Sequence, residues 1–217
     1  KDNFHLVLTE QQIKKNTAIV KYIKNLRKNV YLNIIKPHNF GPVYSALQVK
    51  TIKDDSSTVI SYCDFLVDWD YKKFKREIYG YDGAIVSFKG FHPSSFTGTL
   101  YCYLKVQNRL VTELREKKSF TNKPFEEFAS TGIYYFKDFG IFKENGYKAL
   151  KNKNMIKQHK EIYVSLPYIY LLNDKANILK QFRHRNRKNS LCHGAGSERR
   201  FHIKTQKSNT GVSQPNI

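Results

Sequence analysis

The sequence predicts an α/β fold with a mixed, mainly parallel β-sheet. In its first half, short runs rich in β-branched and aromatic residues alternate with segments whose apolar residues recur at helical spacing. The runs are residues 4–8, 30–35 and 59–63, and helical patterns separate them. Strand–helix–strand order of this kind is typical of right-handed crossovers between parallel strands. The second half changes to closely spaced strand-like runs, which predict a more antiparallel region.

Local signals place the boundaries of these elements. Thr9-Glu-Gln-Gln12 has the spacing of a capping box, which predicts that a helix begins after Thr9. Pro37 ends the second strand, and the next helix is predicted over 44–52. Gln107-Asn-Arg109 is short enough to form a hairpin. The remaining predicted strands are 84–89, 99–106, 110–116 and 131–137, and the remaining predicted helices are 69–79, 138–152 and 161–172.

Composition indicates a folded protein in a reducing compartment. The chain has 217 residues, of which 40% are hydrophobic and 14% aromatic, as is typical of globular proteins. Cys63, Cys102 and Cys192 lack the paired spacing of a metal site, and the first two fall in strand-like runs, so we expect them to be buried thiols. The sequence has no apolar run long enough to cross a bilayer and does not start with a signal peptide. We therefore expect a cytoplasmic protein without a membrane partner.

Positive charge gathers near the end of the chain. The formal net charge is +20, and the segment from Gln181 combines runs such as Arg183-His-Arg-Asn-Arg187 with few apolar residues and no periodicity. We therefore predict one domain over residues 1–180 and a basic, disordered tail over residues 181–217. Because aromatic-rich, periodic sequence changes abruptly to sequence without a pattern, a second interpretation is that this segment lies outside the original reading frame.

The most informative local feature is Asp64, which directly follows the strand-like run Val59-Ile-Ser-Tyr-Cys63. Ligands of open α/β sheets bind outside the carboxyl ends of parallel strands. A carboxylate at that edge can hold a hydrated Mg²⁺ and, through it, the phosphates of a nucleotide. The alternative is an ordinary strand whose Asp starts a turn or caps a helix. Asp68 and Asp70 are further carboxylates nearby, and a solvated helix start explains both.

Five motifs follow one another in an order that resembles the sugar-1-phosphate nucleotidylyltransferases. They are GPVYSALQV (41–49), VISYCDF (59–65), YDGAIVSF (81–88), VTELREKKSF (111–120) and ASTGIYYFK (129–137). The resemblance lies in the succession of motifs and covers roughly residues 4–175. It implies a Rossmann-like three-layer sandwich, the fold of nucleotide-diphospho-sugar transferases. It also implies transfer of a nucleotidyl group from a nucleoside triphosphate to a sugar-1-phosphate, with release of pyrophosphate.

The resemblance assigns the nucleotide side of the site to the first two motifs. It places Gly41 and Ser45 beside the nucleotide, where a side-chain-free turn lets the ligand approach backbone N–H groups. It makes Asp64 both a nucleotide-binding residue and the Mg²⁺ ligand. The alternative for Gly41 is a plain helix start after a loop.

The resemblance assigns the sugar-phosphate side to Glu116, Lys117 and Gly132. The carboxylate of Glu116 would accept hydrogen bonds from sugar hydroxyls, and the ammonium of Lys117 would neutralise the phosphate. Gly132 would let the backbone run close to the sugar. The alternatives are a solvated charge pair for Glu116 and Lys117, and a β-bulge for Gly132.

The sequence departs from the family pattern at its start. The family begins with a strand and a Gly-rich loop that holds a catalytic Arg, followed by Pro-Lys, and nothing ahead of Phe4 matches them. We therefore expect the first strand of the fold to be missing, and catalytic residues stay unassigned. A second metal-binding acid also has no counterpart. We expect such a chain to bind nucleotide weakly and to turn over poorly or not at all.

Two other classes of function are open. A glycosyltransferase of a similar fold would use Asp64, Asp68 and Asp70 as its metal-binding acids and a nucleotide sugar as donor. A non-catalytic nucleic-acid binder would use the basic tail and the many tyrosines. No RNA-binding motif accompanies the lysines, so we do not expect nucleic acid as a partner. Zinc sites, a Ser/His/Asp triad and a phosphate-binding P-loop find no support in the sequence.

Overall fold

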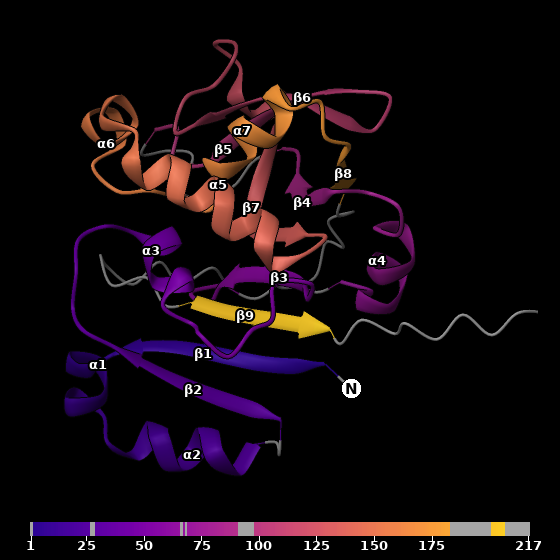
Figure 1. The fold of residues 1–217 in the computed structure, drawn as a ribbon. Coiled ribbons are helices and arrows are strands. Elements are labelled where there is room, and N and C mark those ends of the chain that lie inside the picture. The colour runs from indigo at the N-terminus through magenta and orange to yellow at the C-terminus, as the bar shows by residue number, and fades with distance from the viewer. Residues whose placement is uncertain are drawn as a thin grey trace, which may run out of the picture.

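The computed structural model describes residues 2–26, 29–65, 67, 69–90, 98–182 and 201–206. Its strands are β1 (Asn3–Thr9), β2 (Val30–Ile35), β3 (Ser57–Tyr62), β4 (Gly83–Phe88), β5 (Cys102–Gln107), β6 (Leu110–Glu116), β7 (Phe128–Phe136), β8 (Ile178–Phe182) and β9 (Phe201–Gln206). Its helices are α1 (Glu10–Lys15), α2 (Ala18–Leu26), α3 (Pro42–Leu47), α4 (Tyr71–Glu77), α5 (Phe139–Lys151), α6 (Lys153–His159) and α7 (Pro167–Asn173). The strands form one sheet in the order β2-β1-β9-β3-β7-β4-β8-β6-β5 (Figure 1).

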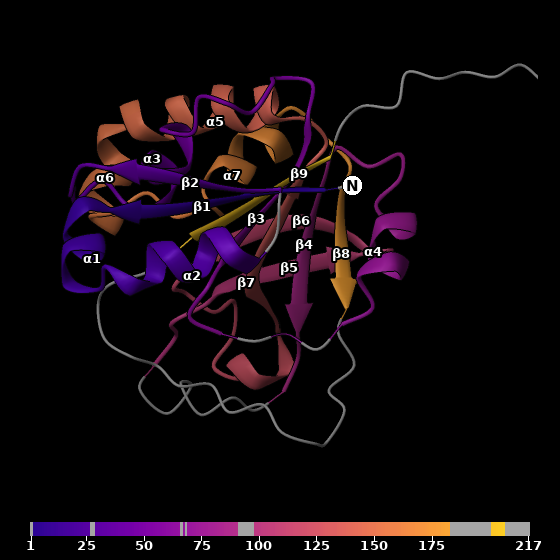
Figure 2. The same cartoon turned by 90° about the horizontal axis from the view of Figure 1, so that it is seen from below.

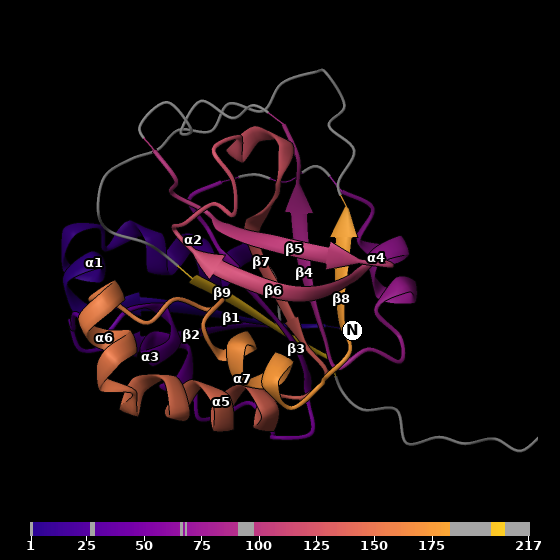
Figure 3. The same cartoon turned by 90° about the horizontal axis from the view of Figure 1, so that it is seen from above.

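The prediction of a mainly parallel sheet in a Rossmann-like three-layer sandwich is wrong. Within the described residues, only β1–β2 and β4–β8 are parallel pairs, and every other strand pair is antiparallel. Strands β7, β4, β8, β6 and β5 also close into a ring, because β5 pairs with β7 as well as with β6 (Figure 3). Local periodicity identifies a strand but not its partner. The sequence therefore did not reveal that β3, unlike β1 and β2, pairs only with antiparallel neighbours in the described sheet.

Strand β9 lies between β1 and β3 and is antiparallel to both. Leu6 of β1 and Ser61 of β3 are both register partners of residue 202. Residues 201–206 belong to the segment predicted to be a tail, and here they form part of the sheet. Residues 183–200 and 207–217 lie outside the described part of the chain, so the predicted domain boundary stays a prediction.

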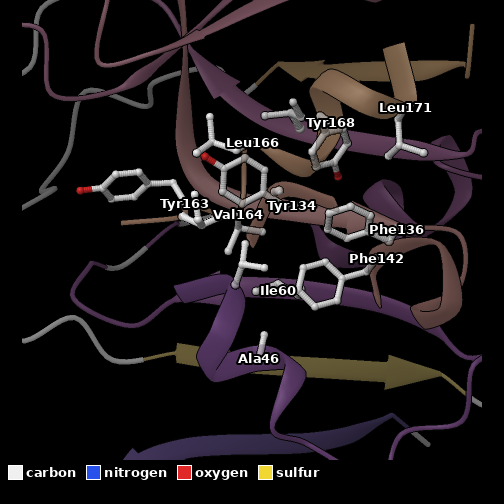
Figure 4. Close-up of a cluster of buried hydrophobic side chains, with 14 of the residues drawn as sticks. Ala46, Ile60, Tyr134, Phe136, Phe142, Tyr163, Val164, Leu166, Tyr168 and Leu171 are labelled. Carbon is white, nitrogen blue, oxygen red and sulfur yellow. The ribbon is translucent and has the colours of Figure 1, made fainter. Parts of the chain in front are cut away.

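Helices cover both faces of the sheet. Helices α3, α5, α6 and α7 lie along one side, whereas α1 and α2 lie against β1 and β2 on the other side (Figure 2). The main core lies between the first group and the sheet and includes Ile60, Phe136, Phe142 and Tyr168, each fully buried (Figure 4). Burying each such side chain stabilises the fold by about 2–3 kcal/mol. A second cluster surrounds the buried Phe74 of α4.

Two predicted helix starts had different outcomes. The capping box at Thr9 is confirmed, because its hydroxyl accepts from the Gln12 amide at 3.3 Å and Gln12 Oε1 accepts from the Thr9 amide at 2.9 Å. The helix predicted from residue 161 begins only at Pro167, a residue favoured at the first helical position. Residues 161–166 instead form an irregular stretch, which we term the linking segment. No helix in the described ranges is long and apolar enough to span a membrane.

Candidate functional site

Gly41 lies directly against the linking segment. Its φ of +87° belongs to the region that favours glycine. The Ile162 amide donates to the carbonyl of Phe40 at 3.1 Å, and the Val43 amide donates to the carbonyl of Ile162 at 3.1 Å. A Cβ at position 41 would lie 2.7 Å from the Ile162 nitrogen. Close backbone packing therefore requires glycine here, in addition to the helix start that was the alternative prediction.

Ser45 is buried in α3 and forms a hydrogen bond with His38, whose Nε2 lies 2.9 Å from the serine Oγ. The Phe40 amide donates to His38 Nδ1 at 3.2 Å, so Nδ1 carries no proton and Nε2–H donates to Ser45. Burial lowers the pKa of His38, and the negative charge of Glu161 partly opposes this shift. Since His38 donates to Ser45, it does not act as a base that would activate this hydroxyl.

Glu116 ends β6 and is only 9% exposed. Its Oε2 accepts a hydrogen bond from the hydroxyl of Ser165, at 2.6 Å, and Ser165 is fully buried in the linking segment. Glu116 therefore does not belong to a solvated run of charges, which was the alternative prediction. Burial raises the pKa of the neighbouring Cys102 thiol well above its usual range, and the negative charge of Glu116 adds to this effect.

Lys117 follows Glu116 with a φ of +56°, a backbone conformation that residues other than glycine rarely adopt. Its amide donates to the carbonyl of Tyr101 at 2.8 Å. Its ammonium donates to the hydroxyl of Tyr163 at 2.5 Å and lies 4.3 Å from the centroid of that ring. His159, at the end of α6, lies close enough for the Lys117 charge to lower its pKa, in addition to the larger effect of burial. Two groups that can carry positive charge thus gather at the end of β6.

Gly132 lies in β7 with a φ of +89°. Strand pairing between β4 and β7 shifts register next to it, so the predicted β-bulge is present. A Cβ at position 132 would lie 2.8 Å from the ring of Tyr62 and 2.9 Å from the ring of Phe65. The hydroxyl of Tyr62 accepts from the amide of Val164 at 3.4 Å, which connects this bulge to the linking segment.

Asp64 lies in an exposed bend, separated from the end of β3 by one residue and next to Phe65. It does not cap α4, because the cap of that helix is Asp70, whose Oδ1 accepts from the Lys73 amide at 2.9 Å. The helix-start explanation of Asp70 is thus confirmed, whereas Asp68 lies outside the described residues. In the described part of the chain, no three His, Cys, Asp or Glu side chains are grouped to hold a metal. Asp64 alone suits a Mg²⁺ that binds phosphates at the same time, because protein ligands then number only one or two.

The linking segment connects these predicted residues to one another. Ile162 binds the backbone on both sides of Gly41, Tyr163 binds Lys117, Val164 binds Tyr62 beside Gly132, and Ser165 binds Glu116. Figure 4 shows Tyr163 and Val164 beside Tyr134 of β7, with the Tyr163 hydroxyl pointing away from the buried cluster. Asp64 is connected to this arrangement through its neighbour Phe65, whose ring lies beside Gly132.

Sequence reasoning missed the linking segment because its apolar residues fit a helical pattern. Pro167 was the signal that could have corrected this, since proline is favoured where a helix begins. A helix start at Pro167 leaves the polar side chains of Tyr163 and Ser165 in a loop beside the core. Residues in such loops are frequent binding and positioning residues.

Comparisons with known proteins define the class of fold. No family model matches the chain, and no curated protein matches it. A nucleoside-diphosphate-sugar pyrophosphorylase from Vibrio cholerae RC9 superposes with a TM-score of 0.62 at 14% identity, over 83% of this chain and 72% of that one. An inositol-1-phosphate CTP transferase from T. maritima gives a TM-score of 0.56 at 9% identity, over 80% of this chain and 63% of that one.

The chain therefore has a nucleotidyltransferase-like fold. This bears out the coarser part of the resemblance seen in the sequence, the likeness to nucleotidyltransferases, whereas the predicted Rossmann-like three-layer sandwich of mainly parallel strands is wrong. At these identities the likeness concerns the arrangement of the backbone.

Proposed function

We propose that this chain is a sugar-phosphate nucleotidyltransferase-like protein that acts on a nucleoside triphosphate and a sugar-1-phosphate. The observation that carries the proposal is the Glu116–Lys117 pair, a buried carboxylate and the ammonium of the following residue, each held by a side chain of the linking segment. The likeness to a sugar-nucleotide pyrophosphorylase and to an inositol-1-phosphate CTP transferase supports the same kind of reaction. Gly41 packs against Ile162 of the linking segment, and Gly132 lies beside Tyr62, which binds Val164 of the same segment, so both support a site that spans both substrates.

In the proposed reaction, a phosphate oxygen of the sugar-1-phosphate forms a bond to the α-phosphorus of the triphosphate. The bond between the α- and β-phosphates breaks, and its electron pair leaves with pyrophosphate. Both reactants are anions, so alignment and charge neutralisation account for most of the rate. Lys117 would neutralise the sugar phosphate, and Glu116 would accept a hydrogen bond from a sugar hydroxyl.

Mg²⁺ is part of the proposal as a cofactor. Asp64 would hold it, and when bound the ion would neutralise phosphate charge. The sequence has no match to the Gly-rich Arg loop that the family uses around the triphosphate, so no catalytic residue is assigned.

A pyrophosphate-release assay tests the proposal. A panel of sugar 1-phosphates is incubated with each nucleoside triphosphate and Mg²⁺, and products are identified by mass spectrometry. Lys117→Met should abolish release, whereas Lys105→Met, on an exposed part of β5, should leave it unchanged. A nucleoside diphosphate released from a nucleotide-sugar donor would instead indicate a glycosyltransferase. Equal pyrophosphate release from the two variants would overturn the assignment of Lys117.

A further inference from the structure

Tyr163 holds the ammonium of Lys117 with two parts of its side chain. The hydroxyl accepts a hydrogen bond from Lys117 Nζ at 2.5 Å, and the ring centroid lies 4.3 Å from the same nitrogen. Tyr163 itself is only 3% exposed, so it has little freedom to follow the lysine into solvent. A cation held by a hydroxyl at the edge of a buried aromatic ring is restrained more strongly than one on an open surface.

Ser165 holds the other member of the pair. Its hydroxyl donates to Glu116 Oε2 at 2.6 Å, and the serine is fully buried. A hydrogen bond to an ionised carboxylate is stronger than one between neutral groups. Loss of the serine hydroxyl would therefore release one side of the carboxylate without changing its charge.

The backbone on either side of Tyr163 is also fixed by hydrogen bonds. Ile162 exchanges hydrogen bonds with Phe40 and Val43 on either side of Gly41, and the Val164 amide donates to the Tyr62 hydroxyl. Backbone contacts of residues 162 and 164 thus alternate with side-chain contacts of residues 163 and 165. The linking segment is thus fixed by its backbone contacts, and its side chains hold both Lys117 and Glu116.

We propose that Tyr163 and Ser165 are positioning residues that set the Lys117 ammonium and the Glu116 carboxylate as one unit for a phosphorylated polyol. The substrate part of this inference rests on the proposed function, whereas the positioning part does not. Lys117 keeps its unfavourable φ of +56° because the contacts around it, including those of Tyr163, determine its place. Neither Tyr163 nor Ser165 was among the residues that the sequence motifs single out.

The test observes Lys117 directly by NMR of the full chain with ¹³C-labelled lysine, and Lys117→Met identifies its signal. In the native protein, the ring of Tyr163 should shift the ε-methylene protons of Lys117 upfield. Tyr163→Phe should retain this shift because the ring remains, and Tyr163→Leu should remove it. Tyr168→Phe is the matched control, since Tyr168 is also buried but bonds the carbonyls of Ala84 and Tyr135 in the core.

The same signal reports on binding. Titration with α-D-glucose 1-phosphate and with inorganic phosphate should perturb it, and Tyr163→Leu should raise both dissociation constants about tenfold. Ser165→Ala should raise the dissociation constant for glucose 1-phosphate and leave that for inorganic phosphate unchanged. In the proposal Glu116 accepts hydrogen bonds from sugar hydroxyls, which inorganic phosphate lacks. Tyr168→Phe should alter neither constant.

The two parts of the inference fail in different ways. A native Lys117 signal without an upfield shift, or a shift that survives in Tyr163→Leu, would overturn the positioning role whatever the chain binds. An upfield shift as expected, together with no response to either ligand at millimolar concentration, would uphold the positioning role. In that case the substrate part would be rejected, whereas the proposed function is tested separately by pyrophosphate release.

Discussion

Three residues of the candidate site adopt positive φ, namely Gly41, Lys117 and Gly132, with values of +87°, +56° and +89°. Such conformations persist where the surroundings determine them, and they concentrate at functional sites. The two glycines could be read from the sequence because glycine is the residue that such backbone favours. The conformation of Lys117 could not, because nothing in a lysine side chain favours it.

Substitution of Gly41 by Ala should destabilise the fold by about 2 kcal/mol or more, because the new Cβ adds a backbone clash to the unfavourable φ. The clash arises because that Cβ would lie 2.7 Å from the Ile162 nitrogen. Gly80 is the matched control, since its φ is +83° but a Cβ there meets nothing within 4 Å. Gly80→Ala should therefore cost only about 1 kcal/mol. Urea unfolding measures both, and equal losses would contradict the packing of Gly41 against Ile162.

His5 should make stability depend on pH. It is 3% exposed and stacked on Tyr31 at 4.9 Å, and burial lowers its pKa from 6.5. The unfolded chain then binds the proton more readily than the folded protein, so the free energy of unfolding decreases as pH falls below about 6.5. Thermal unfolding at pH 7.5 and 5.5 should show this loss.

His5→Phe keeps the stacking on Tyr31 but cannot bind the proton, so its loss between the two pH values should be smaller. His38 and His159 also have pKa values lowered by burial, so they account for the remaining loss. An identical loss in the native protein and in His5→Phe would exclude His5 as a contributor.

At the scale of elements, local signals predicted well wherever neighbours in the sequence determine the structure. The capping box at Thr9, the hairpin between β5 and β6 and the helix α5 all depend on contacts within a few residues. The linking segment was missed because its structure depends on partners distant in sequence, such as Lys117 and Glu116. A helical pattern of apolar residues cannot reveal those partners.

Helix α5 tests this local determination, because it begins with a side-chain cap. Asp138 Oδ1 accepts a hydrogen bond from the Ile141 amide at 2.7 Å. Asp138→Ala should destabilise the fold by about 1 kcal/mol, whereas Asp138→Asn should retain most of the stability, since asparagine also caps helices. Chemical denaturation measures the difference. A loss in Asp138→Asn as large as in the alanine variant would show that charge, not capping, stabilises this end.

At the scale of the whole molecule, strand pairing is the part that the sequence did not reveal. The pattern of apolar residues located most strands, but the closed ring of β7, β4, β8, β6 and β5 depends on pairings between distant segments. The local backbone of the candidate site residues was more predictable than the sheet, whereas their roles stay a prediction. These residues stand at a strand end, at a glycine turn and in a β-bulge, which leave local signals, and β5 pairs with both the end of β6 and the start of β7.

Strand β9 gives the sharpest test at this scale, because it bridges β1 and β3 through backbone pairing on both edges. A chain that ends after residue 200 would leave both edges unpaired, and we expect its free energy of unfolding to fall by at least about 2 kcal/mol. A chain that ends after residue 206 retains β9 and is the matched control, which should be as stable as the full chain. Urea unfolding of the three proteins makes the comparison. If ending at 200 and ending at 206 gave equal stability, residues 201–206 would act as the tail that their composition predicts, and β1 would be an edge strand in solution.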